Sequence, residues 1–141
     1  MDASNYSNFI LKTVSNHYGR ILSKAIIAIF CQDFVNGDKR IYLVDGDLNY
    51  QKEKKGDAWY YRLIEASYSL QNMGLLKFNP SDKTLEITEL GKQLVKNMPV
   101  NDRDLYLSEF QKRYQDVIAA ASNPSEGMKL KTVKQKNTGI F

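Results

Sequence analysis

The residues best able to do chemistry in this chain do not assemble into a familiar metal site. Asp45, Asp47 and Asn49 have the alternating spacing with which a calcium-binding loop begins. Such a loop needs glycine at its sixth position and a bidentate glutamate at its twelfth, and this chain has Tyr50 and Gly56 there. We therefore interpret the segment as a turn and expect no metal site.

Nucleophilic and redox chemistry are not indicated either. Cys31 is the single cysteine, and it lies in an apolar, helical-looking run where a thiol usually acts as a small buried side chain. His17 is the single histidine and is far from Cys31 in sequence, so no zinc set or Cys-His pair is evident. No phosphate-binding or dinucleotide-binding glycine motif occurs. We expect no enzyme activity and no cofactor.

Length and composition indicate one ordinary domain with a real core. The chain has 141 residues, of which 43% are hydrophobic. Its longest strongly apolar run, residues 25–31, is much shorter than the roughly 20 residues that span a bilayer. The N-terminus has no basic-then-apolar signal pattern. We expect a cytoplasmic protein with no membrane partner.

The net charge of +4 is distributed unevenly along the chain. Residues 1–122 contain 16 Lys and Arg against 15 Asp and Glu, whereas residues 123–141 contain four Lys against one Glu. The body is therefore nearly neutral and the last 19 residues are basic. Any contact of the body with phosphate must come from local clusters of lysine and arginine.

Apolar periodicity and turn-forming residues predict the elements that position these side chains. Apolar residues at spacings of three and four predict helices over residues 5–17, 21–34, 57–72, 89–97 and 102–122. Short apolar runs predict strands over residues 41–44, 75–78 and 84–87. We interpret residues 45–47 as a turn and 51–56 as an exposed loop. Asp57 and Thr88 are good helix N-caps, and Gly74 stands where a helix C-cap favours glycine.

Part of this pattern resembles a known domain. The order of helix, Gly-Leu-Leu, hairpin and Ile-Thr-x-x-Gly-x-x-Leu is that of a winged helix-turn-helix. The residues concerned resemble the N-terminal winged-helix domain of Mrr-type restriction endonucleases, and more loosely MarR-like and PadR-like regulators: Arg62, Ala66, Leu70, Gly74, Leu75, Leu76 and the run from Ile87 to Leu94. The resemblance covers about residues 60–96. This chain departs from the Mrr-like pattern at Glu65, where that pattern has tryptophan, and no nuclease domain follows.

The resemblance implies a mainly α fold with a small β-hairpin wing (α+β), that is, a winged helix-turn-helix with extra N- and C-terminal helices. We divide the chain into an N-terminal helix (1–19), a winged-helix domain (20–98), a C-terminal helix (99–122) and a basic flexible tail (123–141). The C-terminal helix either folds back on the first helix or pairs with its twin in a homodimer, which would suit a palindromic DNA site.

If the helix over residues 57–72 reads duplex DNA, as the resemblance implies, its outer side chains contact bases and nearby lysines contact phosphates. We expect a transcriptional regulator or mobile-element accessory factor that binds duplex DNA modestly and without catalysis. The nucleic-acid-binding residues are then Lys52, Lys54, Lys55, Arg62, Ser69, Asn72, Lys77 and Lys83.

An alternative is a winged helix that serves as a protein–protein interaction module, either a subunit or an inhibitor. The expected outer face of the reading helix carries tyrosines and no lysine, a composition that protein interfaces favour. In this alternative the protein partner docks through Tyr61, Ile64, Tyr68, Leu107, Phe110 and Tyr114.

Overall fold

The computed structural model describes residues 1–98. The expected helix over 102–122, with its proposed interface residues Leu107, Phe110 and Tyr114, lies outside the described residues. So does the tail over 123–141.

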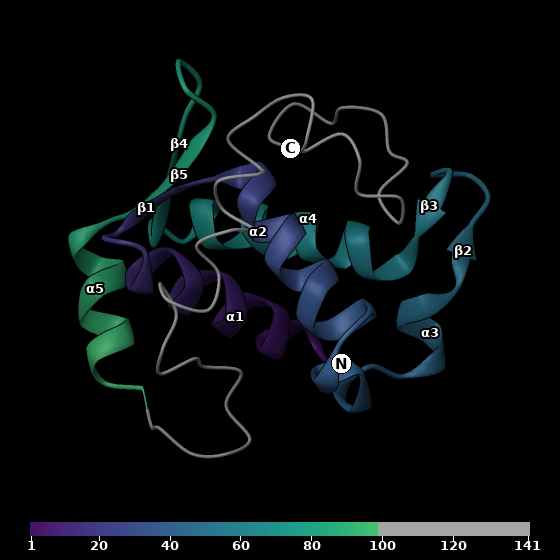
Figure 1. Cartoon of the computed structure of the whole chain (residues 1–141). Helices are drawn as coiled ribbons and strands as arrows, with labels where there is room; N and C mark the ends of the chain where they lie inside the picture. Colours follow the sequence, from purple (N-terminus) through teal and green to yellow (C-terminus); the bar gives the residue numbers. More distant parts are fainter. Residues whose placement is uncertain (99–141) are drawn as a thin grey trace.

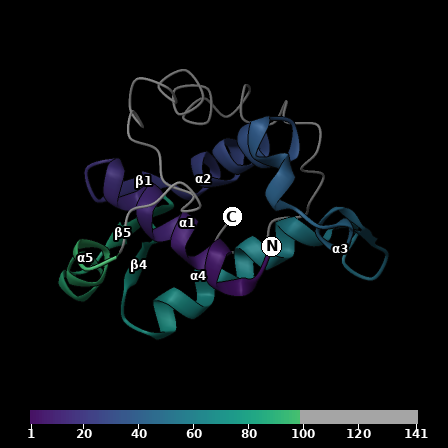
Figure 2. The same cartoon turned by 90° about the horizontal axis from the view of Figure 1, so that it is seen from below.

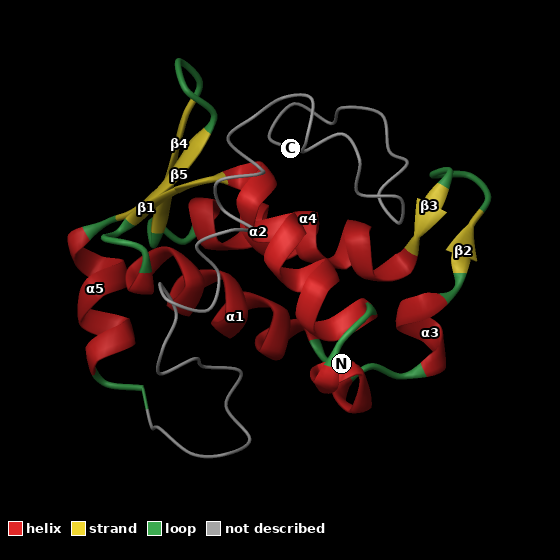
Figure 3. Ribbon diagram, in the orientation of Figure 1, coloured by secondary structure: helices red, strands yellow, loops and turns green. Residues whose placement is uncertain are grey.

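Helices dominate the described part of the chain, and small antiparallel sheets complete it (Figure 3). The α-helices are α1 (Ala3–Asn16), α2 (Ser23–Phe30), α3 (Asp45–Leu48), α4 (Ala58–Asn72) and α5 (Glu89–Lys96). The strands are β1 (Arg20–Leu22), β2 (Tyr50–Gln51), β3 (Gly56–Asp57), β4 (Leu76–Asn79) and β5 (Thr84–Ile87). The expected fold class, mainly α with a small β-hairpin, is confirmed.

The strands form two separate antiparallel units. One is a three-stranded sheet in the order β1-β5-β4, so that the hairpin β4–β5 gains a third strand from near the N-terminus. Ile21 of β1 stands opposite Leu85 of β5, and both are buried. The other unit is the short hairpin β2–β3, which comes directly before α4. Figure 1 shows the two hairpins extending from opposite ends of the helical body toward the same side, the upper one in that view.

The core lies between α1, α2 and α4, with α1 in the middle when the molecule is seen from below (Figure 2). Phe30, the last residue of α2, contacts aromatic rings from each neighbouring element. Its ring stacks on Trp59 of α4 at 5.3 Å and on Tyr6 of α1 at 5.5 Å, and Phe9 meets it edge-on at 5.3 Å. Residues 1–19 therefore share one core with the rest of the described chain. Apart from Lys24 every residue of α2 is buried, as its nearly continuous apolar sequence predicts.

The segment before α4 differs from its sequence-based interpretation. We expected a strand over residues 41–44, but Asp38–Tyr42 form a 3-10 helix after a π-helical turn over Cys31–Val35. No described strand lies beside this segment, and Ile41 is 83% exposed. Arg40 donates a hydrogen bond to the carbonyl of Val35 at 2.6 Å and so holds the chain in a compact turn. The expected turn at 45–47 begins α3, and the expected loop over 51–56 includes the ends of β2 and β3.

From α4 to α5 the structure follows the expectation closely. Asp57 occupies the N-cap of α4, although its side chain makes no capping hydrogen bond. Gly74 follows the helix with a φ of 77°, a left-handed conformation that favours glycine. β4 begins one residue later than predicted because the Leu75 N–H still bonds back to the carbonyl of Leu70 at 2.9 Å. Thr88 caps α5 by accepting a hydrogen bond from the Gly91 N–H.

Gly91 allows α5 to lie very close to the start of β4. A Cβ atom at this position would lie 2.3 Å from the Leu75 carbonyl oxygen and 2.7 Å from a side-chain carbon of Ile87. Both distances are far below van der Waals contact. Gly91 therefore permits a close approach of its helix to the sheet.

We predict that Gly91→Ala destabilises the protein by about 1–3 kcal/mol, the usual cost of overpacking. In an exposed helix the same change would stabilise by up to about 1 kcal/mol, because alanine is the better helix former. Thermal unfolding followed by circular dichroism measures the difference. The exposed neighbour Gln93→Ala is the matched control and should leave the melting temperature nearly unchanged. A Gly91→Ala variant as stable as the parent would contradict the close packing of α5.

Candidate nucleic-acid interface

The candidate site is the exposed face of α4 together with the two hairpins at its ends. The inner side of α4 buries Trp59, Leu63, Ala66 and Leu70, which are three or four residues apart. Ile64 was expected on the outer face and is 4% exposed, which corrects its place in the proposed protein interface. It belongs to the same core cluster as Tyr60, one turn earlier, so the buried side of α4 is wider than the stripe of Trp59, Leu63, Ala66 and Leu70.

Arg62 was expected to contact DNA from the flank of α4, but the structure directs its guanidinium to a fully buried carboxylate. Its Nη1 lies 2.6 Å from Oδ1 of Asp47 in α3. The hydroxyl of Tyr6 donates to the same oxygen at 2.7 Å, and the α-ammonium group of Met1 and the Val44 N–H donate to Oδ2. Arg62 thus joins α4 to α3 through this ion pair.

The environment of Asp47 explains this pairing. Burial raises the pKa of the Asp47 carboxyl, but hydrogen bonds from the Met1 ammonium, Tyr6, Val44 and Arg62 outweigh it, so the pKa lies below the ordinary 3.8. A buried carboxylate with two cationic partners is stable as the charged form. Both oxygens accept hydrogen bonds from these internal donors. Asp47 therefore has a structural role in the segment that we had interpreted as a turn.

The exposed face of α4 keeps five of the side chains considered from sequence. Tyr61 is half-buried, and four others are exposed: Glu65, Tyr68, Ser69 and Asn72. Glu65, in the middle of this face, forms an ion pair of 3.4 Å with Lys54 of the β2–β3 turn. The face is thus polar toward the C-terminal end of α4, where Ser69 and Asn72 offer a hydroxyl and an amide.

Lysines flank this face at both ends of α4. Lys52, Lys54 and Lys55 are exposed in the turn between β2 and β3, and Lys77 and Lys83 are exposed on the β4–β5 hairpin. Because α4 begins directly after β3 and leads through a short turn into β4, the covalent chain itself places one lysine group at each end of the helix. The structure therefore places lysines at the two ends of α4 and Ser69 and Asn72 on its exposed side, whereas Arg62 pairs with Asp47.

The β4–β5 hairpin is braced by polar side chains on one face of the sheet. Arg20 of β1 bonds Asp82 at 2.5 Å and Thr84 at 3.0 Å, and Thr84 donates to Asp82 at 2.7 Å. Asn79 reaches Glu86 at 3.2 Å. Arg20 and Asp82 compensate each other's charge, and Lys77 stands opposite Glu86 in the strand pairing. Lys83, in the turn, is therefore the main source of positive charge toward the hairpin tip.

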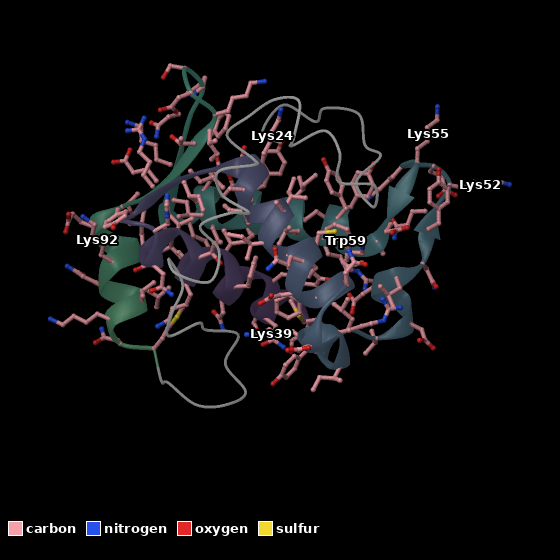
Figure 4. The ribbon with its side chains drawn as sticks, in the orientation of Figure 1. Lys24, Lys39, Lys52, Lys55, Trp59 and Lys92 are labelled. Carbon is pink, nitrogen blue, oxygen red and sulfur yellow. The ribbon has the colours of Figure 1, made fainter. Side chains whose placement is uncertain are left out.

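Sequence reasoning missed Lys24 as a candidate contact. It is the only exposed residue of α2, and Figure 4 shows it pointing toward the side on which Lys55 and the β4–β5 tip lie. Lys39 and Lys92 lie away from that side in the same view. Lysine is almost never fully buried, and Lys24 is the one lysine in the apolar run of α2, so this pattern could have identified it from sequence.

Neither a metal nor a membrane is indicated by the described residues. Within residues 1–98 no group of three or more His, Cys, Asp and Glu is arranged to hold a metal ion. The same part of the chain contains no helix that is both long and apolar enough to cross a bilayer.

Comparisons with protein-family models, with curated proteins and with solved structures find no significant match to this chain.

We predict that Arg62→Ala lowers the free energy of unfolding by about 1–3 kcal/mol. The variant leaves the buried Asp47 carboxylate with fewer donors, but Arg62 is itself 41% exposed in its side chain, so the loss stays below that of a fully buried pair. Chemical denaturation measures the loss. Lys92→Ala removes the exposed ion pair to Glu89 and serves as the control, with an expected change within about 0.5 kcal/mol. Equal stabilities of the Arg62→Ala variant and the parent would show that this ion pair is dispensable.

The pH dependence of stability should carry the signature of Asp47. The pKa of Asp47 is lower in the folded protein than its ordinary value of 3.8. The stability that the charged carboxylate contributes is therefore fully present above pH 3.8 and is lost as the pH falls through the lower, folded pKa. We expect Asp47→Asn to be less stable than the parent at pH 7 and the gap to narrow as the pH falls below 3.8. Unfolding curves at several pH values between neutral and strongly acidic conditions measure this gap. A gap that stays constant over that range would assign the loss to packing.

Proposed function

We propose that this protein is a winged-helix DNA-binding protein, a transcriptional regulator or mobile-element accessory factor that binds duplex DNA without catalysis. The observation that carries the proposal is the exposed face of α4, which presents Ser69 and Asn72 between two lysine-bearing hairpins. Side-chain hydroxyls and amides read base edges in the major groove, and lysines at the groove edges hold the phosphates.

The element order also supports this proposal. α4 leads through Gly74 into the hairpin β4–β5, and α5 then packs back against the sheet, which is the order that the winged helix-turn-helix resemblance implies. That resemblance also requires a helix before the reading helix. In this interpretation α2 is that helix, because Phe30 at its end stacks on Trp59 of α4, and residues 36–57 are an insertion between the two.

Charge sets the expected strength of binding. In residues 1–98 there are 13 Lys and Arg against 11 Asp and Glu, and Arg20, Lys54 and Arg62 already form ion pairs. The net charge of these residues is therefore only +2. Affinity should therefore be modest and should fall as salt rises.

The first experiment measures binding of the full chain to a mixed-sequence DNA duplex by fluorescence polarisation at two salt concentrations. A variant with alanine at Lys129, Lys131, Lys134 and Lys136 separates the contribution of the basic tail. Salt-dependent binding by that variant supports a DNA-binding body. Binding that disappears with the tail lysines contradicts the proposal.

We predict that Ser69→Ala combined with Asn72→Ala weakens sequence preference without changing stability, because both side chains are exposed. Selection from a random-sequence duplex library provides the readout. The parent should enrich a motif, and the variant should lose preference at one or two positions, each base contact being worth about 1–3 kcal/mol. An unchanged motif would place base reading on another surface.

A protein-interaction module is the second candidate, and exposed apolar side chains favour it. Ile41, Val44 and Tyr50 of the inserted segment are exposed, and Tyr68 is exposed on α4. Apolar and aromatic side chains exposed together mark partner surfaces. Replacing Ile41 and Tyr68 with serine and comparing the proteins that co-purify tests this candidate. Loss of a partner that the parent retains, with no DNA binding by the parent, would favour it over the first.

A further inference from the structure

The short hairpin β2–β3 is held against α4 by side-chain contacts from the helix. Its strands are two residues each, pairing Tyr50 with Asp57 and Gln51 with Gly56. So short a hairpin is unstable by itself in water. Contacts beyond the hydrogen bonds between β2 and β3 must therefore fix the direction in which the hairpin extends.

Tyr61, on the first turns of α4, supplies most of that support. Its hydroxyl donates a hydrogen bond to the backbone carbonyl of Lys54, and its ring lies 5.2 Å from the Lys54 ammonium group. Glu65, one turn further, forms the ion pair with Lys54 at 3.4 Å. A hydrogen bond of 2.8 Å from the Ala58 N–H to the Asn49 carbonyl joins the hairpin base to the start of α4. Tyr61 and Glu65, on successive turns of α4, thus both contact Lys54 in the loop between β2 and β3.

The other two lysines of this loop, Lys52 and Lys55, lie at the surface. Lys54 is partly neutralised by Glu65, and Lys52 and Lys55 are exposed on either side of it. Figure 4 shows Lys55 extending upward, toward the side of the molecule on which Lys24 and the β4–β5 tip lie, and Lys52 at the outer edge of the hairpin. Positive charge is therefore present at the end of α4 opposite the β4–β5 hairpin.

We propose that the β2–β3 hairpin is a second phosphate-binding arm, positioned by Tyr61, and that the two hairpins hold the sugar-phosphate backbone of duplex DNA at both ends of α4. α4 has 15 residues and is about 22 Å long at 1.5 Å per residue. A reading helix lies in the major groove, which is about 12 Å wide, so arms at the two ends of such a helix come near the sugar-phosphate backbone that borders the groove. This inference rests on the proposed function.

Tyr61 is in this view a positioning residue and not a docking residue for a partner. Its hydroxyl is engaged with the backbone of its own chain. Glu65 lowers the charge that Lys54 can offer to phosphate. Base reading is then concentrated toward the C-terminal end of α4, at Ser69 and Asn72.

The test compares double alanine variants of the full chain, each without two lysines. The variants are Lys52→Ala with Lys55→Ala for the arm, Lys77→Ala with Lys83→Ala for the β4–β5 hairpin, and Lys92→Ala with Lys96→Ala on α5 as the control. Affinity for a mixed-sequence duplex is measured at a series of salt concentrations. The basic tail is the same in every protein, so differences report the body.

We expect the arm variant to reduce the slope of log affinity against log salt by about two units, and the β4–β5 variant to do the same. Between 50 and 200 mM salt a parent with two more phosphate contacts loses about tenfold more affinity than the variant. The α5 control should match the parent. If the arm variant has the same salt dependence as the parent and the β4–β5 variant does not, the β2–β3 hairpin is not a phosphate-binding arm. The proposed function stands in that case. If the parent shows no salt-dependent binding to the duplex, both are wrong.

Tyr61→Phe tests the positioning role, because it keeps the ring and removes the hydroxyl. Hydrogen exchange of the amides in residues 50–57 should become faster, and affinity for the duplex should fall. The fall should vanish when Tyr61→Phe is added to the Lys52→Ala, Lys55→Ala variant, because the arm then lacks the two lysines proposed to contact phosphate. A residue with only a structural role would lower affinity equally in both backgrounds, and that result would overturn the assignment.

Discussion

The buried carboxylate of Asp47 is the constraint on which the arrangement around α4 depends. An unpaired charge in the interior is costly, so the fold must bring donors to it. Tyr6 arrives from α1 and Arg62 from α4, and the carboxylate itself belongs to α3. One side chain thereby connects the first helix, the inserted segment and the candidate reading helix. The position of the β2–β3 hairpin follows, since it leads from α3 directly to α4.

The same constraint decides which residues of α4 remain for a partner. Arg62 is directed toward Asp47, Ile64 enters the core, and Tyr61 holds the Lys54 backbone. What remains outward is Glu65, Tyr68, Ser69 and Asn72, a face that is polar but not basic. Positive charge is instead supplied by the hairpins at the two ends. In the proposed function, base reading falls to Ser69 and Asn72 toward the C-terminal end of α4, and phosphate binding falls to the hairpin lysines.

Sequence signals predicted the segment from α4 to α5, where interactions between residues close in the chain decide the conformation. Gly74 and Thr88 were identified as helix boundaries because a left-handed residue and a side-chain cap act within a few residues. Residues 41–44 were misassigned as a strand, since apolar residues there suggest one and only the absence of a pairing strand in the described fold excludes it. The third strand of the sheet was missed for the related reason that β1 pairs with β5, more than sixty residues away.

Sequence by itself determined that this chain is mainly α, that a hairpin follows the long helix, and that lysines precede and follow that helix. These properties come from apolar spacing, caps and composition, which are read within a few turns of chain. Only the tertiary structure decided that Arg62 pairs with the buried Asp47 carboxylate, that Ile64 is buried and that Lys54 lies against Tyr61 and Glu65. Each of these features depends on a partner that tertiary packing brings near. The clearest case is Asp47, the partner of Arg62. A side chain's availability for function is set by such partners, and its type and helical position alone do not reveal them.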